Sequence, residues 1–103
     1  MTITAKEREL MIEALDKGEK VLIRVYGKDA RMRKSEKESA RNLIQRGIDV
    51  PLILLRQVCM GLEYLYFCDN RQGEGISDLL GKLSKMCGYQ RLGTLILEAK
   101  ESA

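Results

Sequence analysis

Residues 50–68, VPLILLRQVCMGLEYLYFC, are the most apolar stretch of this 103-residue chain, and they decide its fold. Apolar residues recur along the stretch at intervals of three and four: Leu52, Leu55, Cys59, Leu62 and Tyr66. This spacing predicts a helix, and apolar side chains spread around its other faces require neighbours on several sides. The stretch is about as long as a membrane span. Two charges, Arg56 and Glu63, would each cost about 2.5–3.5 kcal/mol in the bilayer, so we expect a buried helix instead.

The chain ahead of this stretch opens on a helix signal and continues with a strand signal. Thr4 and Glu7 stand three residues apart, which is the spacing of a capping box, and they predict a helix that Gly18 ends. Residues 21–26, VLIRVY, are short, apolar and β-branched, and Gly27 follows them. This pattern predicts a strand over 21–26, paired with another segment or with a second copy of the chain.

Three more helices are predicted by periodicity and by their end signals. One spans 35–46 and ends at Gly47; the helix of residues 50–68 then begins with Pro51 in its first turn. Further helices are expected over 77–86 and over 92–99. Several residues of the helices over 35–46 and 77–86 are expected to face inward: Ala40, Leu43, Ile44, Leu79, Leu80, Leu83 and Met86. The spacing of Leu92, Leu95, Ile96 and Ala99 suits the last helix.

These elements predict a mainly α protein in which residues 1–103 form one compact domain. We expect a bundle of about five short helices with one short strand. Short apolar runs leave a small α+β domain as the alternative, with residues 64–67 and 94–97 as strands.

The residue composition argues against several classes of function. The chain has no His, which removes the commonest general base and the commonest metal ligand. Its three cysteines, Cys59, Cys68 and Cys87, have no paired spacing, so we expect reduced thiols, no metal site and no cofactor. Cys68 lies next to a predicted loop and is the thiol to test for reactivity. We therefore expect a non-enzymatic cytoplasmic protein, without a secretion signal at the observed start.

Positive charge is concentrated in residues 20–46. This segment holds nine Lys or Arg against three acids, a net of +6, whereas the whole chain carries +3. Within the predicted helix, Arg33, Lys37 and Arg41 fall at i, i+4 and i+8 on one face, and like charges at that spacing repel each other. Such a stripe favours a negatively charged partner such as a phosphate backbone.

The candidate nucleic-acid-binding residues are five bases of the turn and helix over 31–41: Arg31, Arg33, Lys34, Lys37 and Arg41. Glu38 lies near Lys34 and Arg41 on the helix and offsets part of their charge, so an ordinary solvated face is a competing interpretation. A helix-turn-helix is disfavoured because its second helix would open on the apolar residues 51–55, which cannot read base edges.

Two functional hypotheses follow from these patterns. The first is a small accessory or regulatory protein that binds nucleic acid, or an acidic protein, through residues 31–41. The second is a protein–protein interaction module, a homodimer joined through the apolar helix 50–68 or through the edge of strand 21–26.

Overall fold

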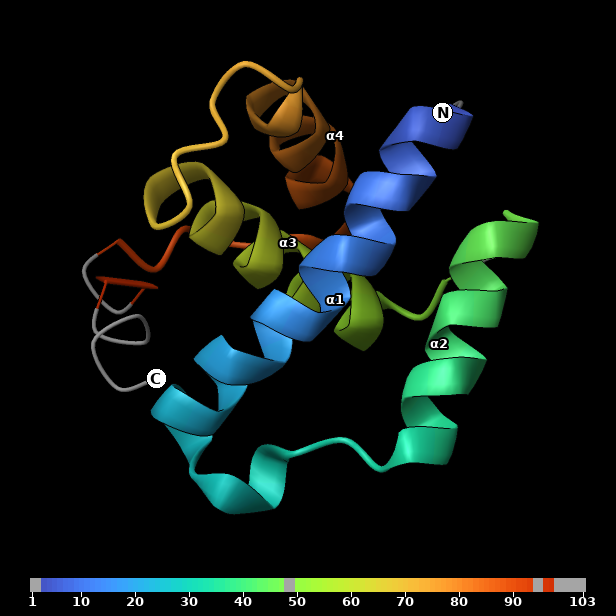
Figure 1. Cartoon of the computed structure of the whole chain (residues 1–103), viewed down its shortest axis with the longest axis vertical. Coiled ribbons are helices and arrows are strands. Elements are labelled where there is room, and N and C mark those ends of the chain that lie inside the picture. The colour runs from blue at the N-terminus through green and yellow to red at the C-terminus, as the bar shows by residue number, and fades with distance from the viewer. Residues whose placement is uncertain (1–2, 48–49, 94–95, 98–103) are drawn as a thin grey trace.

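The computed structural model describes residues 3–47, 50–93 and 96–97. Four α-helices and one short 3₁₀ helix occur in this part of the chain: α1 (Ala5–Tyr26), η1 (Lys28–Ala30), α2 (Lys34–Arg46), α3 (Leu52–Phe67) and α4 (Ile76–Cys87). In Figure 1, α1 crosses the molecule diagonally over α3, α2 returns along one side of α1, and α4 lies against α3. The mainly α fold class is therefore confirmed.

The predicted strand over 21–26 is wrong, because α1 continues through Gly18 as far as Tyr26. Gly18 does not end the helix; it lets α1 approach α3. A β-carbon at Gly18 would lie 2.0 Å from the carbonyl oxygen of Gln57, so only glycine fits there. Beyond this contact Val21 is fully buried beside Tyr64, which gives the β-branched segment a helical place in the core.

A second glycine completes the crossing of α1 and α3. A β-carbon at Gly61 would lie 1.7 Å from the carbonyl oxygen of Ala14, so the two backbones touch directly. The amide of Gln57 donates a hydrogen bond of 3.1 Å to the carbonyl oxygen of Leu15 at the same crossing. This buried polar contact fixes the register of the two helices.

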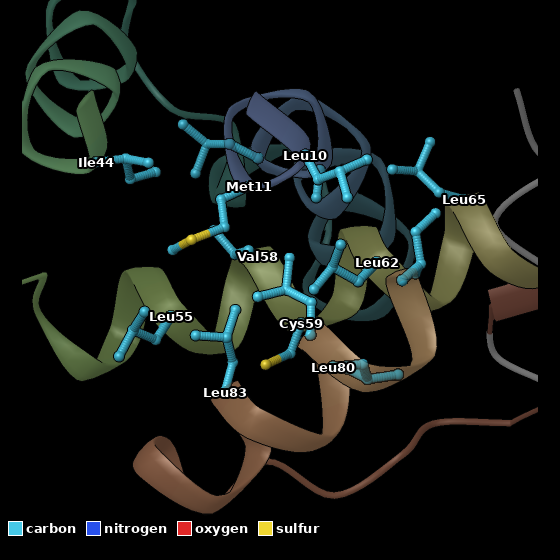
Figure 2. Packing of buried hydrophobic residues seen from close by; sticks show 14 of the residues in the cluster. Leu10, Met11, Ile44, Leu55, Val58, Cys59, Leu62, Leu65, Leu80 and Leu83 are labelled. Carbon is cyan, nitrogen blue, oxygen red and sulfur yellow. The ribbon is translucent and has the colours of Figure 1, made fainter. Parts of the chain in front are cut away.

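The main core lies between α1, α3 and α4. In Figure 2, Val58, Cys59 and Leu62 of α3 lie between Leu10 of α1 and Leu83 of α4. Burial of α3 by both neighbours agrees with the many-sided apolar pattern of residues 50–68. In the described part of the chain no helix has the length and apolar character needed to cross a membrane.

The predicted helix boundaries are mostly confirmed. The capping box of Thr4 and Glu7 is present, and α3 begins directly after Pro51. Gly47 and Gly88 end α2 and α4 in the left-handed conformation that favours glycine. Helix α2 begins at Lys34, one residue earlier than predicted, and the main-chain N–H of Arg33 just before it donates a hydrogen bond to the Glu36 carboxylate.

The C-terminal predictions can be compared only in part. Residues 64–67 belong to α3, so the alternative strand there is wrong. The described residues do not include Thr94, Leu95 or residues 98–103. The predicted helix over 92–99 and the alternative strand over 94–97 therefore lie partly outside the described residues. Ile96 is described and is fully buried against Val21 and Tyr64, in a small second cluster of the core.

Candidate nucleic-acid interface

The five predicted binding residues divide into two groups in the structure. Arg31, Arg33 and Lys34 are exposed in the turn before α2 and at its first residue. Lys37 and Arg41 are only partly exposed, because they lie on the face of α2 that meets α1. The predicted stripe of three bases therefore does not form one solvent-facing surface.

Lys37 and Arg41 make ion pairs that hold α2 against α1. The Lys37 ammonium lies 2.9 Å from a carboxylate oxygen of Glu19, and the Arg41 guanidinium lies 3.0 Å from Asp16. The Lys37–Glu19 pair is the more buried of the two, so removal of Lys37 would leave the Glu19 carboxylate without this partner. The Arg41–Asp16 pair is more exposed and contributes less to stability. The charge that suggested a partner is thus compensated within the chain at these two positions.

Glu19 also fixes the turn that leads into α2. The residue is only 8% exposed, and its second carboxylate oxygen accepts a hydrogen bond of 3.0 Å from the main-chain N–H of Met32. One carboxylate therefore holds both Lys37 and the backbone between Arg31 and Arg33. The hydrogen bond from Met32 to Glu19 therefore fixes the position of the backbone that carries the exposed Arg31 and Arg33 side chains.

Arg33 is loosely held. Its side chain is 87% exposed and lies 3.8 Å from Glu36, the outer limit of an ion pair. The main-chain N–H of Arg33 makes a long hydrogen bond of 3.4 Å to the same carboxylate. Surface pairs of this type contribute little to stability, so Arg33 can exchange Glu36 for another anion.

The structure adds Lys28 to the exposed bases, in the 3₁₀ helix η1 just after α1. Gly27 turns the chain with φ +93°, and its carbonyl oxygen accepts a hydrogen bond of 3.1 Å from Ala30. The N–H of Arg31 makes a second bond of 3.1 Å to the carbonyl of Lys28, so a compact double turn presents both bases. We call the exposed set Lys28, Arg31, Arg33 and Lys34 the basic corner. Lys28 lies within the charged segment 20–46, but it was not among the predicted binding residues, which all lie in the turn and helix over 31–41.

Some bases elsewhere in the described chain are paired with acids. Lys82 lies 2.9 Å from Glu7, and Lys17 lies 3.5 Å from Asp69. Arg71 is held by both Glu13 and Glu74, and these two carboxylates raise its pKa. Among the described residues Lys28, Arg31 and Lys34 make no ion pair, which is also true of exposed bases elsewhere such as Lys85 and Arg91. The basic corner differs from those positions because it places four exposed bases within residues 28–34.

The cysteines lie in the core. All three are free and buried, so the predicted loop position of Cys68 does not expose its thiol. The sulfur atoms of Cys59 and Cys87 are 3.9 Å apart, and burial, together with the neighbouring Cys87, raises the pKa of Cys59 to about 12. A thiol with so high a pKa is a poor nucleophile at neutral pH. Within the described ranges no group of three or more His, Cys, Asp or Glu side chains is placed to hold a metal ion.

Comparison of the chain with protein-family models, with curated proteins and with solved structures gave no match. The function proposed below therefore rests on the geometry and charge of the chain's own residues.

Proposed function

We propose that this chain is a small non-enzymatic accessory or regulatory protein of the cytoplasm that binds nucleic acid through the basic corner. The single observation that carries the proposal is the exposure of all four bases of this corner within residues 28–34, which run from η1 to the first residue of α2. Segment 28–34 contains only one acid, Asp29. Lysine and arginine side chains clustered in this way attract a phosphate backbone and release its counterions.

The position of the corner at the start of α2 also supports an anionic partner. Backbone dipoles give a helix N-terminus partial positive charge, so bases such as Arg33 and Lys34 are unfavourable there by about 0.3–1 kcal/mol. Folding alone would favour acids at these positions. An anion bound at the corner would interact favourably with both the side chains and the helix end.

The interface of this proposal is smaller than the predicted segment 31–41. Lys37 and Arg41 contribute to this interface only indirectly, because their ion pairs with Glu19 and Asp16 hold α2 against α1. The remaining exposed surface of α2 includes Glu36 and Glu38, which would repel phosphates. The corner, rather than the length of α2, is therefore the proposed contact surface.

The predicted homodimer has less support. Nine residues of α3 are buried within the same chain, between α1 and α4, and segment 21–26 offers no strand edge. The homodimer stays a prediction that light scattering across a range of protein concentrations would test. An acidic protein partner would bind the same basic corner. Such a partner would be recognised because it competes with an oligonucleotide for binding to this protein.

The test is fluorescence anisotropy with labelled oligonucleotides at about 50 mM salt, where phosphate contacts are strongest. The variant is the double substitution Arg31→Glu, Lys34→Glu. Its matched control is Lys85→Glu, Arg91→Glu, which reverses one exposed lysine and one exposed arginine elsewhere and changes the net charge equally.

We expect the corner variant to lose binding and the control to retain most of it. Affinity should also fall steeply as the salt concentration rises. A plot of the logarithm of the binding constant against the logarithm of the salt concentration should fall with a slope of about 0.7–0.9 for each phosphate neutralised. No detectable binding by the unmodified protein at low salt would contradict the proposal. Equal losses in the two double variants would also contradict it, because they would indicate attraction by net charge alone.

A further inference from the structure

Tyr26 stands beside the basic corner and is not used by the fold. It is the last residue of α1, and 69% of its surface is exposed. Burial of an aromatic ring is strongly favourable, so a ring left in water at the edge of a charged site is a candidate contact for a ligand.

The other three tyrosines have partners within the chain. Tyr64 is buried and has the ammonium groups of Lys17 and Lys20 near its ring. Tyr66 packs edge-on against Phe67, with ring centroids 4.9 Å apart, and the Tyr89 hydroxyl donates to Glu63. Among the described residues, the side chain of Tyr26 makes no hydrogen bond, ion pair or ring contact.

Tyr26 is tied closely to the bases of the corner. Gly27 follows it directly, and the main-chain N–H of Gly27 donates a hydrogen bond of 2.8 Å to the carbonyl of Ile23, which closes the last turn of α1. The double turn then presents Lys28 and Arg31 within five residues of the ring. In Figure 1 this segment forms the end of the molecule where α1 passes through η1 to α2.

An exposed aromatic ring beside lysine and arginine matches the chemistry of a single-stranded nucleic acid. The bases of a single strand can stack on such a ring, whereas those of a duplex are already stacked and paired. A duplex would instead require a helix that reads base edges in the major groove. The exposed Glu36 and Glu38 of α2 oppose that mode by repelling the phosphates along the groove.

We propose that the basic corner binds single-stranded nucleic acid, with Tyr26 stacking on a base while Lys28, Arg31 and Lys34 contact the phosphates. This inference rests on the proposed function and adds to it the class of ligand and an aromatic contact. Because stacking needs only the face of a base, little sequence preference is expected.

The test uses labelled 12-nucleotide single strands and a 12-base-pair duplex with the unmodified protein, Tyr26→Ala and Tyr26→Phe. We expect tighter binding of the single strand than of the duplex. Tyr26→Ala should weaken binding of the single strand by roughly 5- to 150-fold, and Tyr26→Phe should retain it because the ring remains. Phe67→Ala is the matched control, since it removes another exposed ring, 43% exposed, at the end of α3.

A second measurement reports stacking directly. The chain has four tyrosines and no tryptophan, so tyrosine emission is observed without interference. An unlabelled oligothymidylate strand should quench part of this emission in the unmodified protein. Tyr26→Phe should bind equally well but lose that part of the quenching.

The outcomes separate this inference from the proposed function. If Tyr26→Ala binds single strands as tightly as the unmodified protein while Arg31→Glu, Lys34→Glu abolishes binding, stacking is overturned and nucleic-acid binding stands. Tighter binding of the duplex would overturn the choice of single strands. Weaker binding of single strands by Tyr26→Ala, with Tyr26→Phe unaffected and the melting temperature unchanged in both variants, would support the inference.

Discussion

The α-carbon of Gly61 in α3 faces the carbonyl oxygen of Ala14 in α1 so closely that a β-carbon would lie 1.7 Å from that oxygen. Gly18 has the same relation to Gln57, at 2.0 Å. The two glycines make the backbone contact between the helices, on which the core and the path to the basic corner depend.

Substitution of either glycine by alanine should therefore be severe. We expect Gly61→Ala to lower the free energy of unfolding by about 3 kcal/mol or more, because backbone atoms must move to relieve the overlap. Gly81→Ala is the control, since Gly81 lies within α4 with nothing within 4 Å of a β-carbon. It should stabilise the protein by about 0.4–1 kcal/mol. Urea denaturation measures both values, and similar behaviour of the two variants would contradict the contact.

Lys34 and Lys37 should have different roles, although both were predicted from the sequence to bind nucleic acid. Lys37→Ala removes the partner of Glu19 and should cost about 1–2 kcal/mol of stability, with modest effect on oligonucleotide affinity. Lys34→Ala should leave stability within about 0.5 kcal/mol and weaken binding. Denaturation and anisotropy on both variants check this. Reduced affinity at full stability in Lys37→Ala would place Lys37 in the interface.

Glu7 should make the protein sensitive to acid. The hydrogen bond with the backbone of Thr4, and then the ion pair with Lys82, lower the pKa of Glu7 from 4.5. Because the folded pKa is the lower one, the stabilisation is present above about pH 4.5 and is lost as the pH falls below it. Glu7→Gln keeps a capping side chain but no charge, so its stability should fall less between pH 5 and about pH 3. Parallel acid unfolding curves for the two proteins would contradict the role of this charge.

Tyr89 should make the protein sensitive to alkali. Burial, and then the hydrogen bond to the fully buried Glu63, raise the pKa of Tyr89 above 10. The stabilisation is thus complete below pH 10 and is lost as the pH rises beyond it. Tyr89→Phe should cost about 1.5–3 kcal/mol at neutral pH, by leaving the carboxylate without this donor, and should reduce the alkaline loss. Tyr26→Phe, at an exposed position, should change neither quantity.

The cysteines should resist modification in the folded protein. Their burial predicts that iodoacetamide at pH 8 labels none of the three until the protein is unfolded, which mass spectrometry measures. Rapid labelling of Cys68 in the native state would restore the prediction made from its position beside a loop. Labelling of Cys59 would conflict with its raised pKa, about 12.

The sequence alone determined where α1 begins and the positions of α2, α3 and α4, because periodicity, the capping box at Thr4, Pro51 and the glycines at 47 and 88 are local signals. It also located the positive charge. The path of α1 beyond Gly18 was decided by tertiary structure: a strand-like segment became helical because Val21 is buried against Tyr64 and Ile96, far away in the sequence.

The division of the basic residues was likewise decided only by tertiary structure. The sequence spacing grouped Arg33, Lys37 and Arg41, but could not reveal that acids on α1 lie opposite two of them. Whether a charged side chain is compensated depends on what the fold places within about 4 Å of it. The ion pairs of Lys37 and Arg41 with acids of α1 reduced the stripe along α2 to a corner of exposed bases, Lys28, Arg31, Arg33 and Lys34. Within the described part of the chain, only Arg33 of these four lies within ion-pair distance of an acid, the exposed Glu36. Tyr26 lies next to this corner in the chain.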